Sequence, residues 1–179
     1  MGIFSNRSCW LLAFFILPFC GYGKAMAQST NQLKESEICQ YWYSQVDPSV
    51  KRPESIKSID GKVDDNTFKG IECLLKLQGQ KGPAKFGGAT RHDVSQIFEA
   101  PSVEVAALYY ISFLYYQKWD HANAVALTDI NTGEIIKADK VAEVYSYYRE
   151  WFKQVKKVGI AKARSKGLDP LTGRKIAWY

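Results

Sequence analysis

The chain has few of the residues on which recognisable enzymes depend. It contains two histidines, His92 and His121, in 179 residues. No GxSxG, HExxH, Walker or GxGxxG motif occurs, so the sequence carries no signature of a serine hydrolase, a zinc peptidase or a nucleotide-binding enzyme. The segment from Asp129 to Glu134 alternates oxygen ligands but lacks the glycine and glutamate positions of a calcium loop. We therefore predict no catalytic residue, no metal and no cofactor.

Long apolar runs are also missing. The longest uncharged run has sixteen residues between Arg7 and Lys24, whereas a membrane-spanning helix needs about 20. A small-x-small triplet that ends at Ala27 follows this run, which is the pattern of a cleavable signal peptide. We predict a signal peptide at residues 1–27, a single domain at residues 28–179, a periplasmic location, and no transmembrane segment after cleavage.

Cysteine is scarce in the predicted mature chain. Cys9 and Cys20 lie in the signal peptide, which leaves only Cys39 and Cys73. In an oxidising compartment, an isolated pair of this kind is predicted to form a disulfide rather than a metal site or a nucleophile. The closed loop is expected to contribute about 3 to 4 kcal/mol to stability.

Basic residues are concentrated near the C-terminus. From Trp151 onward the chain has eight lysines and arginines and one acid, Asp169, whereas residues 28–150 carry a net charge of −3. This basic C-terminal segment could meet an acidic protein, anionic lipid or cell-wall polymer, or could be an ordinary solvated helix face. Export argues against nucleic acid as the natural partner.

Apolar spacing predicts a mainly helical protein. Residues with helical periodicity occupy six segments, namely 32–46, 63–79, 93–100, 101–117, 138–159 and 160–166. Residues 79–93, which are rich in glycine, predict a loop. Residues 122–138 fit either a helix followed by an irregular turn, which we favour, or a small hairpin around 131–133. We expect a single-domain orthogonal bundle of about five to seven helices with one disulfide.

Aromatic residues are the most abundant positive feature. Four tyrosines occur among the thirteen uncharged residues between Glu104 and Lys118, and this segment is apolar nearly all round. Such a pattern predicts a central helix covered on several sides. Some of the aromatic residues, the glycine-rich loop and the basic tail are candidates for a surface that binds a protein partner: Lys85, Phe86, Arg91, His92, Tyr110, Tyr147, Trp151 and Trp178.

The segments VSQIF, VEVAALYYISFLYY, YSYYREWF and LDPLTGRKIAWY together resemble a group of small secreted bacterial proteins of uncharacterised activity. In size, export and lack of active-site motifs, the chain is similar to periplasmic immunity proteins of contact-dependent systems such as type VI secretion. The resemblance implies a non-enzymatic protein that occludes the active site of a delivered effector.

Two other functions are compatible with the sequence. One is a periplasmic enzyme that acts on cell-wall material and uses His92 with Glu99 or Glu104. The other is a carrier that holds a small apolar ligand between the tyrosine-rich helices.

Overall fold

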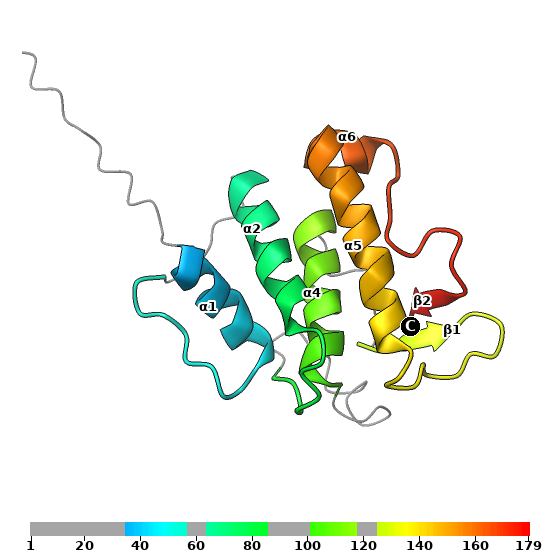
Figure 1. Ribbon diagram of the computed structural model, residues 1–179, viewed down its shortest axis with the longest axis horizontal. Helices are drawn as coiled ribbons and strands as arrows, with labels where there is room; N and C mark the ends of the chain where they lie inside the picture. Colours follow the sequence, from blue (N-terminus) through cyan, green and yellow to red (C-terminus); the bar gives the residue numbers. More distant parts are fainter. Residues whose placement is uncertain (1–34, 57–63, 86–100, 118–124) are drawn as a thin grey trace, which may run out of the picture. The chain divides into compact units, whose positions relative to one another are not determined.

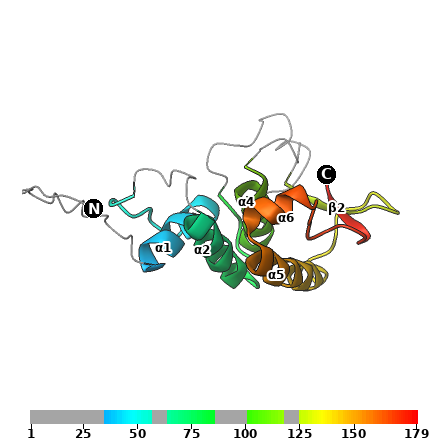
Figure 2. The same ribbon diagram turned by 90° about the horizontal axis from the view of Figure 1, so that it is seen from above.

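Four helices bury apolar side chains against one another in the computed structural model, which describes residues 35–56, 64–85, 101–117 and 125–179. They follow one another across Figure 1, and Figure 2 likewise shows α1 beside α2. Their bounds are Glu35–Val46 (α1), Asp64–Leu74 (α2), Val103–Tyr116 (α4) and Val141–Val158 (α5). Smaller elements complete the fold: the 3₁₀-helix Leu75–Leu77, α6 (Ile160–Ser165), β1 (Leu127–Asp129) and β2 (Ile176–Trp178). The prediction of a mainly helical protein is confirmed.

The helix α4 lies at the centre of the core and contacts α1, α2 and α5. The Ser102 hydroxyl begins it by accepting a hydrogen bond from the backbone N–H of Val105 (3.4 Å), and Gln117 ends it in the left-handed conformation with φ 55°. The helix begins at Val103, two residues after the start expected at residue 101, because Ser102 occupies the cap position. Most of the helix is buried, so the prediction of a central helix covered on several sides is confirmed.

The helix α5 is amphipathic, as its spacing predicts. The residues at helical spacing that are buried are Val141, Val144, Tyr145, Tyr148, Phe152 and Val155, and Val158 is half-buried. Lys156 and Lys157 lie in its last turn, where cations interact favourably with the partial negative charge of the helix C-terminus. The helix therefore presents its apolar face to the core and charged side chains on the exposed face.

The predicted disulfide joins the first two helices. Cys39 on α1 and Cys73 on α2 are bonded, with their Cα atoms 5.1 Å apart. Both side chains are buried. The prediction of this disulfide is confirmed, and the bond holds α1 against α2 at the edge of the core.

The helix α2 also packs very closely against its neighbours at Gly70. A Cβ atom on this residue would lie 2.8 Å from the indole nitrogen of Trp42 and 2.9 Å from a methyl carbon of Leu114. Both neighbours are themselves buried. Only a glycine fits between α1 and α4 without displacing one of these side chains.

We expect Gly70→Ala to lower the free energy of unfolding by about 1 to 2 kcal/mol, because overpacking outweighs the gain in helix propensity. Urea denaturation followed by circular dichroism measures this change. Gly82→Ala is the matched control, since a Cβ at Gly82 meets no atom within 4 Å. Equal stability of the two variants would show that the α2 packing tolerates an added methyl group.

The residues after α4 differ from the structure that we favoured. Leu127–Asp129 form the strand β1 rather than the end of a helix, and β1 pairs with the C-terminal strand β2 in antiparallel register, with Leu127 opposite Trp178. The hairpin alternative occurs in a short form: Thr128 bridges Ile135, and backbone hydrogen bonds join Asp129 to Glu134 (2.9 Å) and Ile136 to Leu127 (2.9 Å). The helix was wrong because the backbone of Leu127–Asp129 bonds to two other segments, Glu134–Ile136 after the local turn and β2 about 50 residues away.

Several predictions fall on residues outside those that the structure describes. They concern the signal peptide at 1–27, the helix at 93–100 and most of the glycine-rich loop. The described elements belong to one unit, Leu33–Tyr179. Among the described helices, none combines the length and the apolar character that crossing a membrane requires.

Candidate functional site

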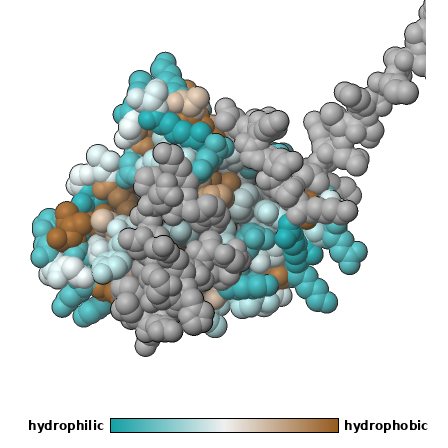
Figure 3. Space-filling model, turned by 180° about the vertical axis from the view of Figure 1, so that it is seen from behind, coloured by the Kyte–Doolittle hydropathy of each residue, from teal (hydrophilic) through white to brown (hydrophobic). Residues whose placement is uncertain are grey.

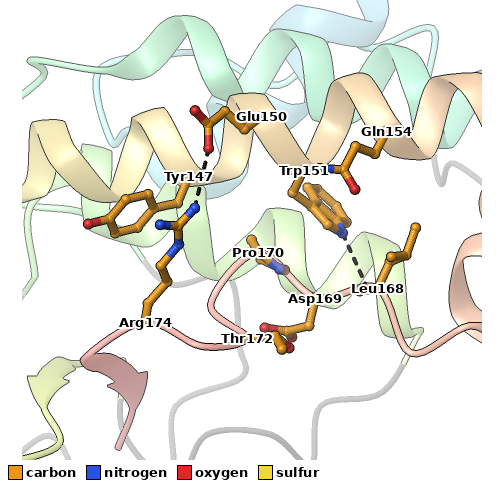
Figure 4. A pocket seen from close by; sticks show the side chains of 9 residues that line it. All are labelled: Tyr147, Glu150, Trp151, Gln154, Leu168, Asp169, Pro170, Thr172 and Arg174. Atoms are coloured by element: carbon orange, nitrogen blue, oxygen red, sulfur yellow. Dashed lines mark hydrogen bonds and ion pairs between the residues drawn. The ribbon is translucent and has the colours of Figure 1, made fainter.

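Two adjoining hollows lie along α5 and the chain segment that leads into β2, and we call them together the C-terminal cleft. The first has a volume of about 200 Å³ and is lined by Tyr147, Glu150, Trp151, Gln154, Leu168, Asp169, Pro170, Thr172 and Arg174 (Figure 4). The second has a volume of about 400 Å³ and is lined by Ser112, Tyr116, Ile130, Tyr148, Asp169, Leu171, Thr172, Arg174, Ile176, Ala177 and Trp178. The two hollows share Asp169, Thr172 and Arg174.

A directed chain of hydrogen bonds supports the second hollow. The indole N–H of Trp178 can only donate, so it donates to the hydroxyl of Tyr148 (3.0 Å). The hydroxyl of Ser112 donates to the carbonyl of Leu108 (3.3 Å) and therefore accepts from Tyr148 (2.8 Å). Burial raises the pKa of Tyr148 above its usual range, so this phenol stays protonated and keeps its position.

Asp169 connects the two hollows. One carboxylate oxygen accepts a hydrogen bond from the hydroxyl of Tyr116, and the other accepts from the backbone N–H of Leu171 (2.7 Å). Burial and the bond to Asp169 both raise the pKa of Tyr116, because each disfavours the phenolate. The turn after Leu168 is thereby attached to the end of α4.

Arg174 lies over the outer face of α5. Its guanidinium carbon is 4.1 Å from the ring centroid of Tyr147, and its Nη2 is 3.3 Å from a carboxylate oxygen of Glu150 (Figure 4). Tyr147 donates a hydrogen bond to Glu143, and this bond is the main reason that the pKa of Tyr147 is raised. An exposed ion pair adds little to stability, but these contacts hold an aromatic ring and a cation side by side at the rim of the cleft.

Exposed apolar side chains occur beside the second hollow. Ile130, Ile135 and Tyr179 are large residues with 58%, 53% and 58% of their surface exposed. Ile130 lines the hollow, and Tyr179 follows the paired strand β2. Figure 3 shows apolar side chains at the surface on the side of the molecule where the strands lie. Such a group is a feature of protein-binding surfaces.

The structure brings only some of the predicted partner-binding residues to this surface. Tyr147 and Trp178 are partly exposed and line the cleft. Lys85 is exposed, but it lines neither hollow, and its backbone N–H donates to Val46 (2.7 Å). Phe86, Arg91 and His92 lie outside the described residues.

Two of the predicted partner-binding residues are instead buried. Tyr110, with 3% of its surface exposed, packs edge-on against Trp42 with ring centroids 6.4 Å apart. Trp151, with 5% exposed, donates its indole N–H to the carbonyl of Leu168 (3.3 Å). Their placement at a surface was wrong because helical spacing does not tell which face of an aromatic-rich helix is covered by a distant segment. Trp151 lies at the bottom of the first hollow and does not project from the surface.

Glu104, one of the two acids proposed for a cell-wall enzyme, is buried and hydrogen-bonded within the fold. Its side chain has 4% of its surface exposed and accepts a hydrogen bond from the backbone N–H of Gly79 (2.7 Å). It lies in the first turn of α4, where a carboxylate interacts favourably with the helix N-terminus. Its suggested partners, His92 and Glu99, lie outside the described residues.

The sequence interpretation missed several cleft residues, above all Ser112, Asp169 and Arg174. For Asp169 and Arg174, the signal was the LDPLTGRKIAWY ending, whose turn pairs and apolar residues indicate a tail that docks. Within the described ranges, no group of three histidines, cysteines and acids is placed to hold a metal ion.

No protein-family model, curated protein or solved structure matches this chain. We therefore describe its class from its fold and its site. The fold is that of a small, mainly helical protein with one disulfide. The site is an open cleft whose rim combines aromatic, apolar and paired charged side chains.

Proposed function

We propose that this chain is a non-enzymatic, exported protein that binds another protein. More specifically, we propose a periplasmic immunity protein that covers the active site of an effector delivered by a contact-dependent system such as type VI secretion. The observation that carries the proposal is the C-terminal cleft with its exposed flank of Ile130 and Tyr179. Tyrosine, tryptophan and arginine around a recessed apolar centre are the residues that dominate binding energy in protein interfaces.

The disulfide supports export. Disulfides persist in oxidising compartments and are rare in the bacterial cytoplasm. The bond between Cys39 and Cys73 is buried and joins two core helices, so it is part of the folded core. A periplasmic location agrees with this chemistry and with the signal peptide predicted at residues 1–27.

The two alternative functions find less support. The carboxylate of Glu104 is engaged by Gly79 beneath the surface, which suits a structural role better than proton transfer to a polymer. A carrier encloses most of its ligand in a pocket, whereas the C-terminal cleft is open and each of its hollows includes the charged residues Asp169 and Arg174.

The proposal is tested by co-expression with the product of the neighbouring gene, which the immunity function predicts to be a toxin active in the periplasm. We expect the full-length chain to restore growth and to co-purify with that product as a complex. Growth arrest with no complex would refute the immunity function. Release of fragments from purified peptidoglycan by the chain alone would favour the enzyme instead.

Within that system, we expect Ile130→Asp to weaken the complex by about tenfold or more, because it places a charge in the apolar part of the interface. The exposed position of Ile130 means that folding should be unaffected. Ala142→Asp is the matched control, since Ala142 is also exposed but lines neither hollow. Calorimetric titration measures both affinities, and equal losses would place the interface elsewhere.

A further inference from the structure

A third hollow, separate from the two hollows of the C-terminal cleft, lies between α2 and α5. This α2–α5 groove has a volume of about 300 Å³ and is lined by Glu72, Leu75, Lys76, Arg149, Phe152, Lys153 and Lys156. Four of the seven lining residues are cations, and one is an acid. The two apolar residues are buried, so they form the floor while the cations surround it.

Two of the cations are held in place by the protein. Arg149 donates a hydrogen bond to the carbonyl of Leu75 (3.3 Å), and its guanidinium carbon lies 5.6 Å from the ring centroid of Tyr145. Lys156 pairs with Glu72 (2.9 Å) and lies 4.9 Å from the ring centroid of Phe152. Their positions are therefore set before any ligand arrives, which reduces the entropy lost on binding.

The other two cations of the groove are Lys76 and Lys153. Lys76 and Lys153 are exposed, and neither forms an ion pair within the part of the chain that the structure describes. Among the described residues that line the groove, Glu72 is the single acid, and it is already paired with Lys156. The groove thus has an excess of positive charge that a ligand could neutralise.

We infer that the α2–α5 groove binds an acidic segment of the protein partner. The inference rests on the proposed protein-binding function and names the chemistry of that partner. Carboxylates would pair with Lys76, Lys153 and the held guanidinium of Arg149. The apolar floor would contact side chains between those carboxylates, as the centre of an interface does inside a charged rim.

A protein segment fits the groove better than an anionic membrane does. Peripheral membrane binding combines cations with apolar side chains that enter the lipid. In the groove, Leu75 and Phe152 are only 8% and 4% exposed, so they are too recessed to enter a bilayer. A narrow segment of acidic protein can reach them, whereas a flat lipid surface cannot.

Binding of a synthetic peptide tests this inference without the natural partner. The probe is a fluorescein-labelled peptide of alternating glutamate and leucine, about ten residues long and therefore extendable over about 30 Å, titrated with the full mature chain and followed by anisotropy. We expect binding that weakens steeply when salt is raised from about 50 to about 200 mM. The same peptide with glutamine in place of glutamate should not bind.

Charge reversal locates the binding site. We expect Lys153→Glu to weaken peptide binding by about fivefold, and Lys76→Glu together with Lys153→Glu by about twentyfold. Lys140→Glu is the matched control, because Lys140 is exposed, does not line the groove and precedes Lys153 by 13 residues, or about 20 Å along the helix axis. It should change the affinity by less than about twofold, because that distance exceeds the screening length of about 10 Å.

The outcomes separate this inference from the proposed function. Equal effects of Lys153→Glu and Lys140→Glu would overturn it, because the attraction would then follow net charge alone. Tighter binding to phosphatidylglycerol vesicles than to the peptide, lost in Lys153→Glu, would also overturn it in favour of a membrane surface. Peptide binding in the groove without any complex in the co-expression experiment would leave the groove standing and refute the immunity function.

Discussion

Removal of the disulfide is expected to lower the free energy of unfolding by about 3 to 4 kcal/mol. The change is Cys39→Ala with Cys73→Ala, which opens a loop between residues 34 positions apart. The bond limits the conformations of the unfolded chain, and its loss makes unfolding entropically easier. Urea denaturation of the purified mature chain, followed by circular dichroism, gives the difference.

Reduction of the unaltered chain is the control for this experiment. With excess reductant, its urea midpoint should move close to that of the double variant, because both then lack the same constraint. A double variant as stable as the oxidised chain would contradict the prediction. It would mean that the packing of α1 on α2 through Ile38, Trp42 and Ile71 suffices without the bond.

Trp151→Ala is expected to cost about 3 to 5 kcal/mol, the range for a large buried aromatic residue. The Trp151 ring packs edge-on against Tyr115, with centroids 4.7 Å apart, and its N–H holds the carbonyl of Leu168 (3.3 Å). The substitution therefore leaves a cavity and also frees the chain segment that forms the C-terminal cleft. Thermal unfolding and urea denaturation should both report the loss.

Tyr147→Ala is the matched comparison, one turn away on the same helix. Tyr147 is only partly buried and contacts Arg174 and Glu143 at the surface, so its loss should cost less than about 1 kcal/mol. Similar costs for both substitutions would contradict the assignment of Trp151 to the core. The comparison also guides binding experiments, since a binding defect of Trp151→Ala would reflect unfolding rather than a lost contact.

The helices could be predicted because their signals are local. On α5, Val141, Val144, Tyr148 and Val155 recur at helical spacing, and that spacing alone places them on one face. The disulfide could be predicted for a similar reason, since Cys39 and Cys73 are the only cysteines left after the predicted signal peptide. Neither prediction required knowledge of how distant segments meet.

The candidate site could be predicted only in part. Trp178 and Tyr147 were expected at a surface and line the C-terminal cleft. Tyr110 and Trp151 were expected there too, yet both are buried. Tyrosine and tryptophan suit core edges and surfaces equally well, so composition cannot separate the two environments.

By itself, the sequence determined the helical class, the approximate bounds of α1, α2, α4, α5 and α6, and the disulfide pair. Helical periodicity acts over short distances, and the cysteine pair follows by elimination. The tertiary structure alone decided that β1 pairs with β2, opposing Leu127 and Trp178. It also decided that the tail covers Trp151 through Leu168. These contacts join residues far apart in the chain, and their free energy depends on packing and hydrogen bonds that exist only once the helices have assembled.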